Sequence, residues 1–218
     1  MKRLYYYYLA AIFSLIGMVI AAGGGYVYAR YRYAVGQDHF RVKSAVAISQ
    51  ANQFPKHQAI LIGDSISEMQ LLDNVCGLKV LNAAIGGTKI EDWPKLSENI
   101  IEITRPKLVI LAIGTNNAAL NVKKSIGEFN YYMSYLIDRN DTRFIIVSPP
   151  NLDVNYPGAQ AFDTVYLKQI QTYIRSLSDK NVAIVPPSGG KDQTVDGVHL
   201  NLKGQQMWAA KLQSACAY

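Results

Sequence analysis

Short apolar runs alternate along most of the chain with longer segments in which apolar residues recur every three or four positions. Most of the short runs lack interleaved polar residues, which is typical of strands buried on both faces. The longer segments have the spacing of amphipathic helices. The predicted strands are residues 59–62, 79–81, 108–113, 144–147 and 182–185, and the predicted helices are residues 67–72, 90–103, 122–136, 162–177 and about 202–214. Strands that alternate with helices predict a parallel, doubly wound α/β sheet.

The first part of the chain has a different pattern. No charged residue occurs from Leu4 to Ala29, a run of 26 residues that is long enough to cross a bilayer as a helix. Tyrosines gather at both ends of this run, as aromatic residues do at the two interfaces of a membrane. We therefore expect residues 1–29 to form a retained transmembrane helix. Ala21-Ala22 and Val27-Tyr28-Ala29 resemble cleavage sites and leave a cleaved signal peptide as the alternative.

The rest of the chain divides into a connector and one domain. Residues 30–58 form a predicted membrane-proximal connector, with a short helix at 42–48 that Phe54-Pro55 should end, because helix geometry is disfavoured before a proline. Residues 59–218 form the predicted globular domain. A chain of 218 residues, of which 50% are apolar, has the length of one ordinary domain.

The positive charge of the chain lies around the apolar run. The net charge is +6; residues 1–43 hold six basic residues and one acidic residue, whereas residues 44–218 hold 16 basic and 15 acidic residues. A nucleic-acid-binding surface should lie on the folded domain, so we predict no nucleic-acid partner. The charges leave the membrane orientation open, because Lys2 and Arg3 favour an N-terminus inside the cell while the basic residues after the run favour the opposite.

Candidate chemistry lies where the predicted strands end. In a doubly wound sheet, functional groups occupy the loops at the carboxyl ends of the strands. Taken singly, the residues there have ordinary structural roles, such as a serine that caps a helix or a glycine pair in a turn. Four such ends are notable: Gly63-Asp64-Ser65, Asn82 to Gly87, Gly114-Thr115-Asn116 and Asp196-Gly197-Val198-His199.

Together these residues supply the groups that acyl transfer requires. The Ser65 hydroxyl becomes a nucleophile when a base takes its proton, and His199 can be that base near neutral pH. Asp196 can orient the imidazole and stabilise its charged form. The backbone N–H groups of Ser65 and Gly87 and the side-chain amide of Asn116 can bind the oxyanion of a tetrahedral intermediate.

The four segments resemble, in order, the sequence blocks of the SGNH hydrolases, also called GDSL esterases and lipases. The resemblance covers about residues 59–218 and implies a three-layer α/β/α sandwich with five parallel strands in the flavodoxin-like order, and no metal or organic cofactor. Two residues depart from the family pattern: Asn117 stands where many members have an acid, and Leu200 stands where proline commonly follows the histidine. Both lie outside the four catalytic roles.

These features lead to one principal hypothesis and two alternatives. The principal hypothesis is a membrane-anchored serine esterase, outside the cytoplasm, that hydrolyses acyl or O-acetyl esters of cell-envelope glycans or lipids. An O-acyltransferase that modifies a polysaccharide would use the same acyl-enzyme, so the sequence does not separate the two. A non-catalytic envelope subunit that retains the fold would have no need for all the site residues. His39, His57 and His199 lack the spacing of metal ligands. The sequence does not indicate which proteins, if any, the chain binds.

Cys76 and Cys216, the only cysteines, are candidates for a disulfide. In a sheet of order 2-1-3-4-5, right-handed crossovers bring the first and last helices to the same face. Cys76 follows the first helix and Cys216 ends the last, so both approach the same corner. The alternative is two unrelated thiols. A disulfide would persist only in an oxidising compartment, which is why we expect the domain outside the cytoplasm.

Overall fold

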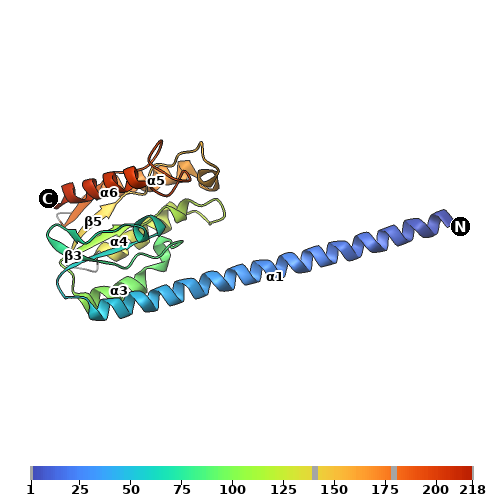
Figure 1. Cartoon of the computed structure of the whole chain (residues 1–218), viewed down its shortest axis with the longest axis horizontal. Coiled ribbons are helices and arrows are strands. Elements are labelled where there is room, and N and C mark those ends of the chain that lie inside the picture. Colours follow the sequence, from blue (N-terminus) through green and yellow to red (C-terminus); the bar gives the residue numbers. More distant parts are fainter. Residues whose placement is uncertain (1, 139–141, 178–180, 218) are drawn as a thin grey trace. The chain divides into compact units, whose positions relative to one another are not determined.

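A computed structural model describes residues 2–138, 142–177 and 181–217, although not the side chains of residues 2–13 and 32–37. The chain divides into two units, Met1–Lys43 and Ser44–Tyr218. The second unit contains a sheet of six strands (Figure 1), which are β1 (Ala59–Gly63), β2 (Asn74–Val75), β3 (Leu78–Asn82), β4 (Leu108–Ala112), β5 (Arg143–Val147) and β6 (Val182–Val185).

The N-terminal residues form one long helix, α1 (Lys2–Gln53). The predicted connector is therefore helical as far as Gln53, and α1 ends just before Phe54-Pro55, as expected. In the part of the chain that the structure describes, no helix has a stretch long and apolar enough to cross a lipid bilayer. The predicted transmembrane helix over residues 4–29 is thus not confirmed; its first residues, up to 13, lie outside the described side chains.

The sheet contains the five predicted parallel strands in the predicted order. Its strand order is β2-β3-β1-β4-β5-β6, and β1 is parallel to both β3 and β4. The sixth strand, β2, was not predicted, because a two-residue strand has no visible periodicity. It pairs antiparallel with β3 through a two-residue turn in which Cys76 and Gly77 have φ angles of 53° and 74°, as a tight hairpin requires.

Five further helices connect or follow the parallel strands: α2 (Ser65–Glu68), α3 (Pro94–Thr104), α4 (Ile126–Asp138), α5 (Thr164–Ser176) and α6 (Leu202–Ser214). Short 3-10 helices lie at Ile90–Asp92, Asn116–Ala118, Pro157–Ala161 and Ala215–Ala217. The bounds of α6 agree with the prediction. The helix expected at 67–72 instead begins at Ser65, because the Asp64 side chain caps it by accepting a hydrogen bond from the backbone N–H of Ile66.

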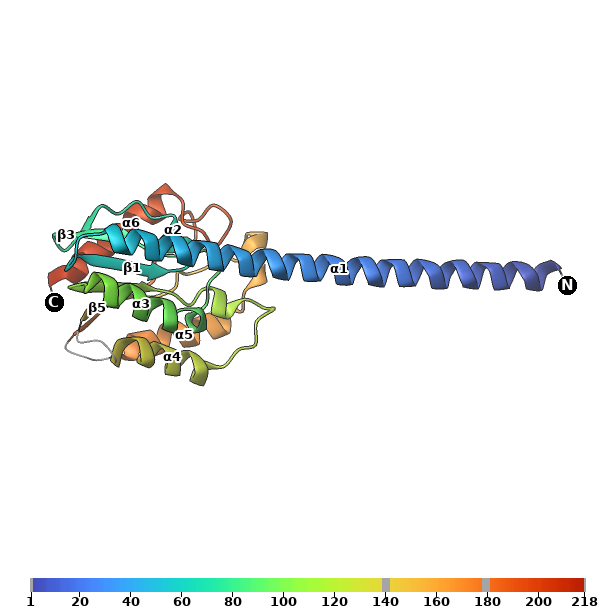
Figure 2. The ribbon, with the colours of Figure 1, turned by 90° about the horizontal axis from the view of Figure 1, so that it is seen from below.

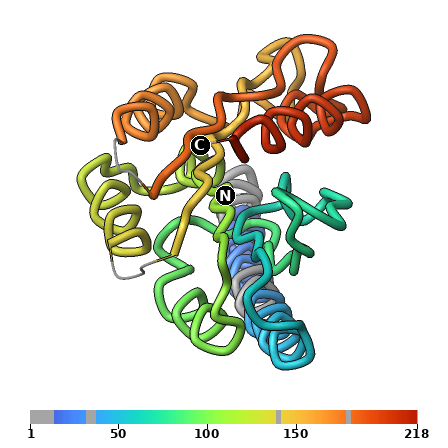
Figure 3. Tube along the Cα trace, turned by 90° about the vertical axis from the view of Figure 1, so that its left-hand side faces the viewer, coloured from blue at the N-terminus to red at the C-terminus, as the bar shows by residue number. Residues whose placement is uncertain are grey.

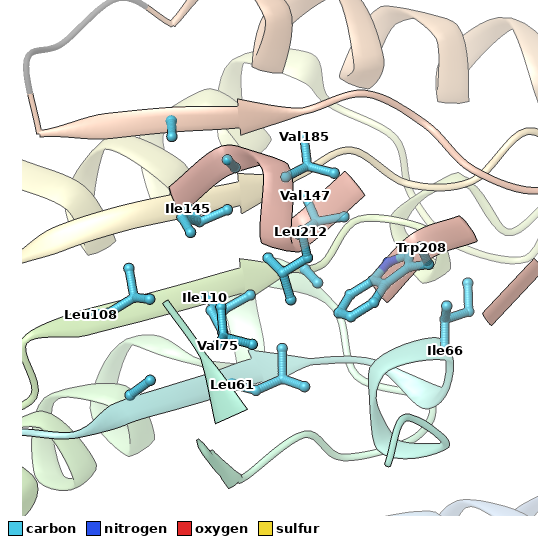
Figure 4. Packing of buried hydrophobic residues seen from close by; sticks show 14 of the residues in the cluster. Leu61, Ile66, Val75, Leu108, Ile110, Ile145, Val147, Val185, Trp208 and Leu212 are labelled. Carbon is cyan, nitrogen blue, oxygen red and sulfur yellow. The ribbon is translucent and has the colours of Figure 1, made fainter. Parts of the chain in front are cut away.

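The helices form layers on both faces of the sheet. Trp208 and Leu212 of α6 pack against Leu61, Ile110 and Val147 of the strands (Figure 4). On the opposite face lie α3, α4 and α5 (Figures 2 and 3). Every residue of β1 and β4 is buried. Burial on both faces explains why these runs are continuously apolar.

The 3-10 helix Ala215–Ala217, which directly follows α6, is covalently attached to the β2–β3 hairpin. Cys76 and Cys216 form a disulfide with a Cα–Cα distance of 5.2 Å. The Arg143 guanidinium also donates hydrogen bonds to the carbonyl oxygens of Ala215 and Cys216, at 3.0 and 3.3 Å. The hairpin precedes β3, so the disulfide lies at the amino ends of the parallel strands. Ser65 follows β1 and therefore lies at their carboxyl ends, which form the opposite edge of the sheet.

Candidate active site

Three predicted site residues form one chain of hydrogen bonds. Ser65 is the first residue of α2, directly after β1, and its Oγ lies 2.9 Å from His199 Nε2. His199 Nδ1 lies 2.7 Å from Asp196 Oδ2. Because a carboxylate only accepts hydrogen bonds, Nδ1 is the nitrogen that donates, and neutral imidazole then accepts from the serine hydroxyl through Nε2.

A tight turn holds the Asp196 carboxylate. Its Oδ1 accepts hydrogen bonds from the backbone N–H groups of Val198 and His199, at 3.0 and 2.8 Å. Burial acts to raise the pKa of Asp196, but the hydrogen bonds from the His199 side chain and the two N–H groups outweigh it and lower the pKa overall. Gly197 has a φ of +91°, and a Cβ there would lie 2.6 Å from the carbonyl oxygen of Asp153. The turn therefore requires glycine at this position.

The backbone on both sides of His199 is also fixed. The carbonyl oxygen of His199 accepts a hydrogen bond from Val195 N–H at 2.9 Å. Leu200, which stands where the family commonly has proline, is 3% exposed and belongs to the core cluster with Trp208 and Leu212. Core packing at Leu200 thus anchors the histidine loop without the proline.

The two predicted oxyanion donors outside α2 lie on adjoining loops. Gly87 is exposed and has a φ of +80°, with no atom within 4 Å of the position of a Cβ. The Asn116 amide donates a hydrogen bond to the carbonyl oxygen of Thr88 at 3.0 Å. An amide nitrogen carries two N–H donors, so this bond leaves a second one that can serve an oxyanion.

Asn117 has a structural role that the sequence did not reveal. Its Oδ1 accepts from Ile90 N–H at 3.0 Å and its Nδ2 donates to Glu91 Oε2 at 2.8 Å. Glu91 also forms an ion pair with Lys89 at 2.9 Å. The Glu91 hydrogen bond raises the pKa of Lys89. Burial acts to raise the pKa of Glu91, but the hydrogen bonds that its carboxylate accepts, including those from Lys89 and Asn117, lower the pKa overall. An asparagine, unlike an acid, can both accept and donate here, and it fixes the loop that follows Gly87.

The structure thus brings Ser65, His199 and Asp196 together and puts Gly87 and Asn116 on loops that follow the neighbouring strands. A Cβ on Gly86 would lie 3.5 Å from Ser65 Cβ. The loop from Asn82 to Gly87, which we call the glycine loop, therefore lies against Ser65. In the described ranges, no group of three or more His, Cys, Asp or Glu side chains could hold a metal ion. The arrangement contains a hydroxyl, a base, an orienting carboxylate and candidate oxyanion donors, which is the set that acyl transfer uses.

Asp64 is a buried carboxyl directly before Ser65. It is 2% exposed, and its Oδ1 accepts from Ile66 N–H at 3.1 Å. Burial raises the pKa of Asp64 to about 6, although hydrogen bonds from Ile66 and Thr115 act in the opposite direction. The folded state therefore binds this proton more tightly than an unfolded chain, in which an aspartate has a pKa of about 3.9.

We expect Asp64 to make the fold less stable as the pH rises. The contribution of Asp64 to the free energy of unfolding is fully present below about pH 4 and is lost as the pH rises through about 6. This change is on the order of 2–3 kcal/mol. Asp64→Asn cannot ionise and keeps an oxygen for Ile66 N–H. Urea unfolding of both proteins at about pH 4 and about pH 7.5 should show the variant gaining stability relative to the wild type at the higher pH. An equal difference at both pH values would contradict the raised pKa.

Comparisons with known proteins agree with this arrangement. The family model described as GDSL-like Lipase/Acylhydrolase matches residues 60–212. No curated protein matches the chain. One similar solved structure is a putative platelet activating factor from Streptococcus pneumonia, with a TM-score of 0.69 and 18% identity over 84% of this chain and 96% of that chain. A second is the lipase/acylhydrolase from Enterococcus faecalis, with a TM-score of 0.59 and 20% identity over 72% of this chain and 94% of that chain. A third is a carbohydrate acetylesterase family member from Sinorhizobium meliloti, with a TM-score of 0.58 and 16% identity over 72% of this chain and 96% of that chain. At these identities the structures indicate a shared fold.

Proposed function

Because the chain belongs to the GDSL-like lipase/acylhydrolase family, we propose that it is a serine esterase in which Ser65, His199 and Asp196 are the catalytic residues. The observation that supports this most directly is the continuous hydrogen-bonded chain from Ser65 Oγ through the His199 ring to Asp196 Oδ2, with distances of 2.9 and 2.7 Å. Family membership supports acyl ester hydrolysis in general, and these contacts support the assignment of the residues.

In the proposed reaction, Ser65 Oγ attacks the carbonyl carbon of the ester while its proton moves to His199 Nε2. Asp196 keeps Nδ1–H oriented and stabilises the imidazolium that forms. The tetrahedral intermediate then collapses, and the leaving alcohol takes the proton from His199. A water molecule then attacks the acyl-enzyme while the same nitrogen takes its proton. As the second tetrahedral intermediate collapses, His199 returns this proton to Ser65 Oγ, and the acid and free Ser65 are released.

The oxyanion in this reaction is bound by the N–H groups of Ser65 and Gly87 and by the Asn116 amide. Asn116→Ala should therefore lower kcat by roughly a hundred-fold, as is typical for loss of one oxyanion donor, with a smaller change in KM. Asn116→Asp, which keeps the shape and removes the donor, should lose activity similarly. The test is steady-state kinetics on both variants, with melting curves that establish whether each variant is folded. Wild-type kcat in both variants would remove Asn116 from the oxyanion site.

We propose acyl or O-acetyl esters of cell-envelope glycans or lipids as substrates. The fold is shared with a structure described as a carbohydrate acetylesterase family member and with one described as a lipase/acylhydrolase, which makes both ester classes reasonable. The test is a panel of short-chain and long-chain acyl esters and acetylated glycans with the purified full chain. Assays for released acid and for acyl groups transferred to added sugars separate an esterase from an acyltransferase. No turnover of any ester would favour the non-catalytic alternative.

We further propose that the globular unit functions outside the cytoplasm. The disulfide between Cys76 and Cys216 supports this, because such bonds persist in oxidising compartments. The anchor over residues 4–29 stays a prediction from the apolar run alone. An anchored chain would remain in the membrane fraction through a high-salt wash, which releases proteins bound only by charge. Recovery of the chain in the soluble fraction would contradict the anchor.

A further inference from the structure

The single-turn helix that begins with Ser65 ends with Glu68, and the Glu68 carboxylate contacts the glycine loop. Glu68 Oε2 accepts a hydrogen bond from the backbone N–H of Gly86 at 2.9 Å. Gly86 directly precedes Gly87, the proposed oxyanion donor. Because peptide units are planar, fixing the N–H of Gly86 leaves only the two backbone torsions of that residue between this contact and the N–H of Gly87.

The Gly86-Gly87 pair needs such a contact because neither residue has a side chain that could fix the backbone. Two successive glycines form the most flexible backbone that a chain can have. At Gly87 no atom lies within 4 Å of the position of a Cβ, so the residue is not held by packing on that side. Oxyanion stabilisation depends on donors that are already in place before the reaction. A loop of this kind therefore requires partners from neighbouring elements.

Gly86 is adapted to the Glu68 contact. A Cβ on Gly86 would lie 2.7 Å from Glu68 Oε2, closer than non-bonded atoms approach. The absence of a side chain thus lets the carboxylate reach the backbone N–H. A hydrogen bond to an ionised acceptor is also stronger than one to a neutral acceptor, which suits a contact that has to restrain a flexible segment.

A second contact joins the same two elements. The Asn82 amide donates hydrogen bonds to the carbonyl oxygens of Ser67 and Gln70, at 2.9 and 3.2 Å. Asn82 ends β3, so the loop from Asn82 to Gly87 is hydrogen-bonded to α2 at its start and again next to its last residue. The Glu68 contact is the one adjacent to the proposed donor.

We propose that Glu68 is a positioning residue for ester hydrolysis: through the N–H of Gly86 it holds the N–H of Gly87 where the oxyanion forms, at a fixed place relative to Ser65. This inference rests on the proposed function. Glu68 acts through the glycine loop and does not touch the substrate. Its position three residues after the nucleophile, on the same helical turn, couples the two sides of the oxyanion site.

The first test compares Glu68→Ala and Glu68→Gln by steady-state kinetics with 4-nitrophenyl acetate, a chromogenic acetyl ester. Glu68→Ala should lower kcat by about 10- to 100-fold, somewhat less than complete loss of an oxyanion donor, with KM within about two-fold. Glu68→Gln retains a carbonyl oxygen for the Gly86 N–H and should recover kcat to within about three-fold of the wild type. Glu102→Ala, at an exposed glutamate on α3, is the matched control and should keep wild-type kcat.

The second test is a double-mutant cycle with Gly86→Ala. The added methyl group displaces the Glu68 carboxylate from the Gly86 N–H, while Glu68 itself stays in the chain. If Glu68 acts through Gly86, the combined variant should lose much less activity than the product of the two single losses. Gly86→Ala also puts a methyl group near Ser65, but that effect is present with and without Glu68 and cancels in the cycle. Should Glu68→Ala not fold, Gly86→Ala alone should still lower kcat at least about ten-fold.

The possible results separate this inference from the proposed function. Wild-type kcat in Glu68→Ala, or multiplicative losses in the cycle, would overturn the role of Glu68 while the esterase remains. A loss in Glu68→Ala that Glu68→Gln fails to recover, with equal melting temperatures, would also overturn it. A wild-type chain whose hydrolysis does not depend on Ser65 would instead overturn the proposed function. A merely structural role would lower the amount of folded protein without changing kcat per folded molecule.

Discussion

Replacing Ser65 with alanine is expected to lower the rate of ester hydrolysis by at least about a thousand-fold. Without the hydroxyl no acyl-enzyme can form, and only the oxyanion donors and substrate binding remain to accelerate attack by water. The measurement is kcat on the ester that the panel identifies as the best substrate. Because Ser65 is only half-buried, at the start of α2, the melting temperature should change little.

His199→Ala should cost about as much as Ser65→Ala, and the double variant should lose little more than either single one. The two residues act as a unit, because the base is useful only when there is a hydroxyl to deprotonate. Losses that multiply in the double variant would indicate separate roles. Full activity in Ser65→Ala, with the protein folded, would exclude the proposed mechanism.

Removing the Cys76–Cys216 disulfide is expected to lower the free energy of unfolding by roughly 3–5 kcal/mol under the loop-entropy model, because the bridge joins residues 140 positions apart. The double variant with serine at both positions avoids a leftover thiol. Denaturant unfolding of this variant and the wild type gives the difference directly. Since the bridge lies at the edge of the sheet opposite to Ser65, kcat of the folded variant should stay within about two-fold of the wild type. An unchanged unfolding free energy would contradict the stabilising role.

The same disulfide tests the proposed compartment. Protein isolated from its host under alkylating conditions, and denatured without a reductant, should contain no free thiol. Two free thiols would show that the bridge does not form in the cell and would remove the support for a domain outside the cytoplasm. Reduction before alkylation, which should label both Cys76 and Cys216, is the control.

The main elements of the sheet could be predicted because burial leaves a pattern in the chain. The strands β1 and β4 are buried at every position, and continuous apolar runs follow from that. Short elements escaped prediction: β2 has two residues, too few for any period. The start of α2 also differed from the prediction of residue 67, because the Asp64 side chain caps the helix and α2 begins at Ser65. In each case a local hydrogen bond, rather than a repeating pattern, decides the element.

The site was predictable to a different degree. Ser65, Gly87, Asn116, Asp196 and His199 could be named because each lies in a segment that follows the carboxyl end of a parallel strand, and these ends converge on one edge of the sheet. Their supporting contacts could not be named in this way. The partners of these contacts are far apart in the sequence: Glu68 binds a residue 18 positions away, and the Asn117 side chain binds one 26 positions away. Only the folded chain brings such pairs together.

Covalent trapping of the nucleophile tests the proposed mechanism most directly. A fluorophosphonate reacts with a serine that an adjacent base has activated and leaves a stable adduct on its Oγ. After treatment of the full chain and digestion, mass spectrometry should locate one adduct, on Ser65. Labelling should be absent in Ser65→Ala and at least about a hundred-fold slower in His199→Ala. A chain that hydrolyses esters but acquires no adduct on Ser65, or acquires one at another serine, would contradict the assignment of the nucleophile.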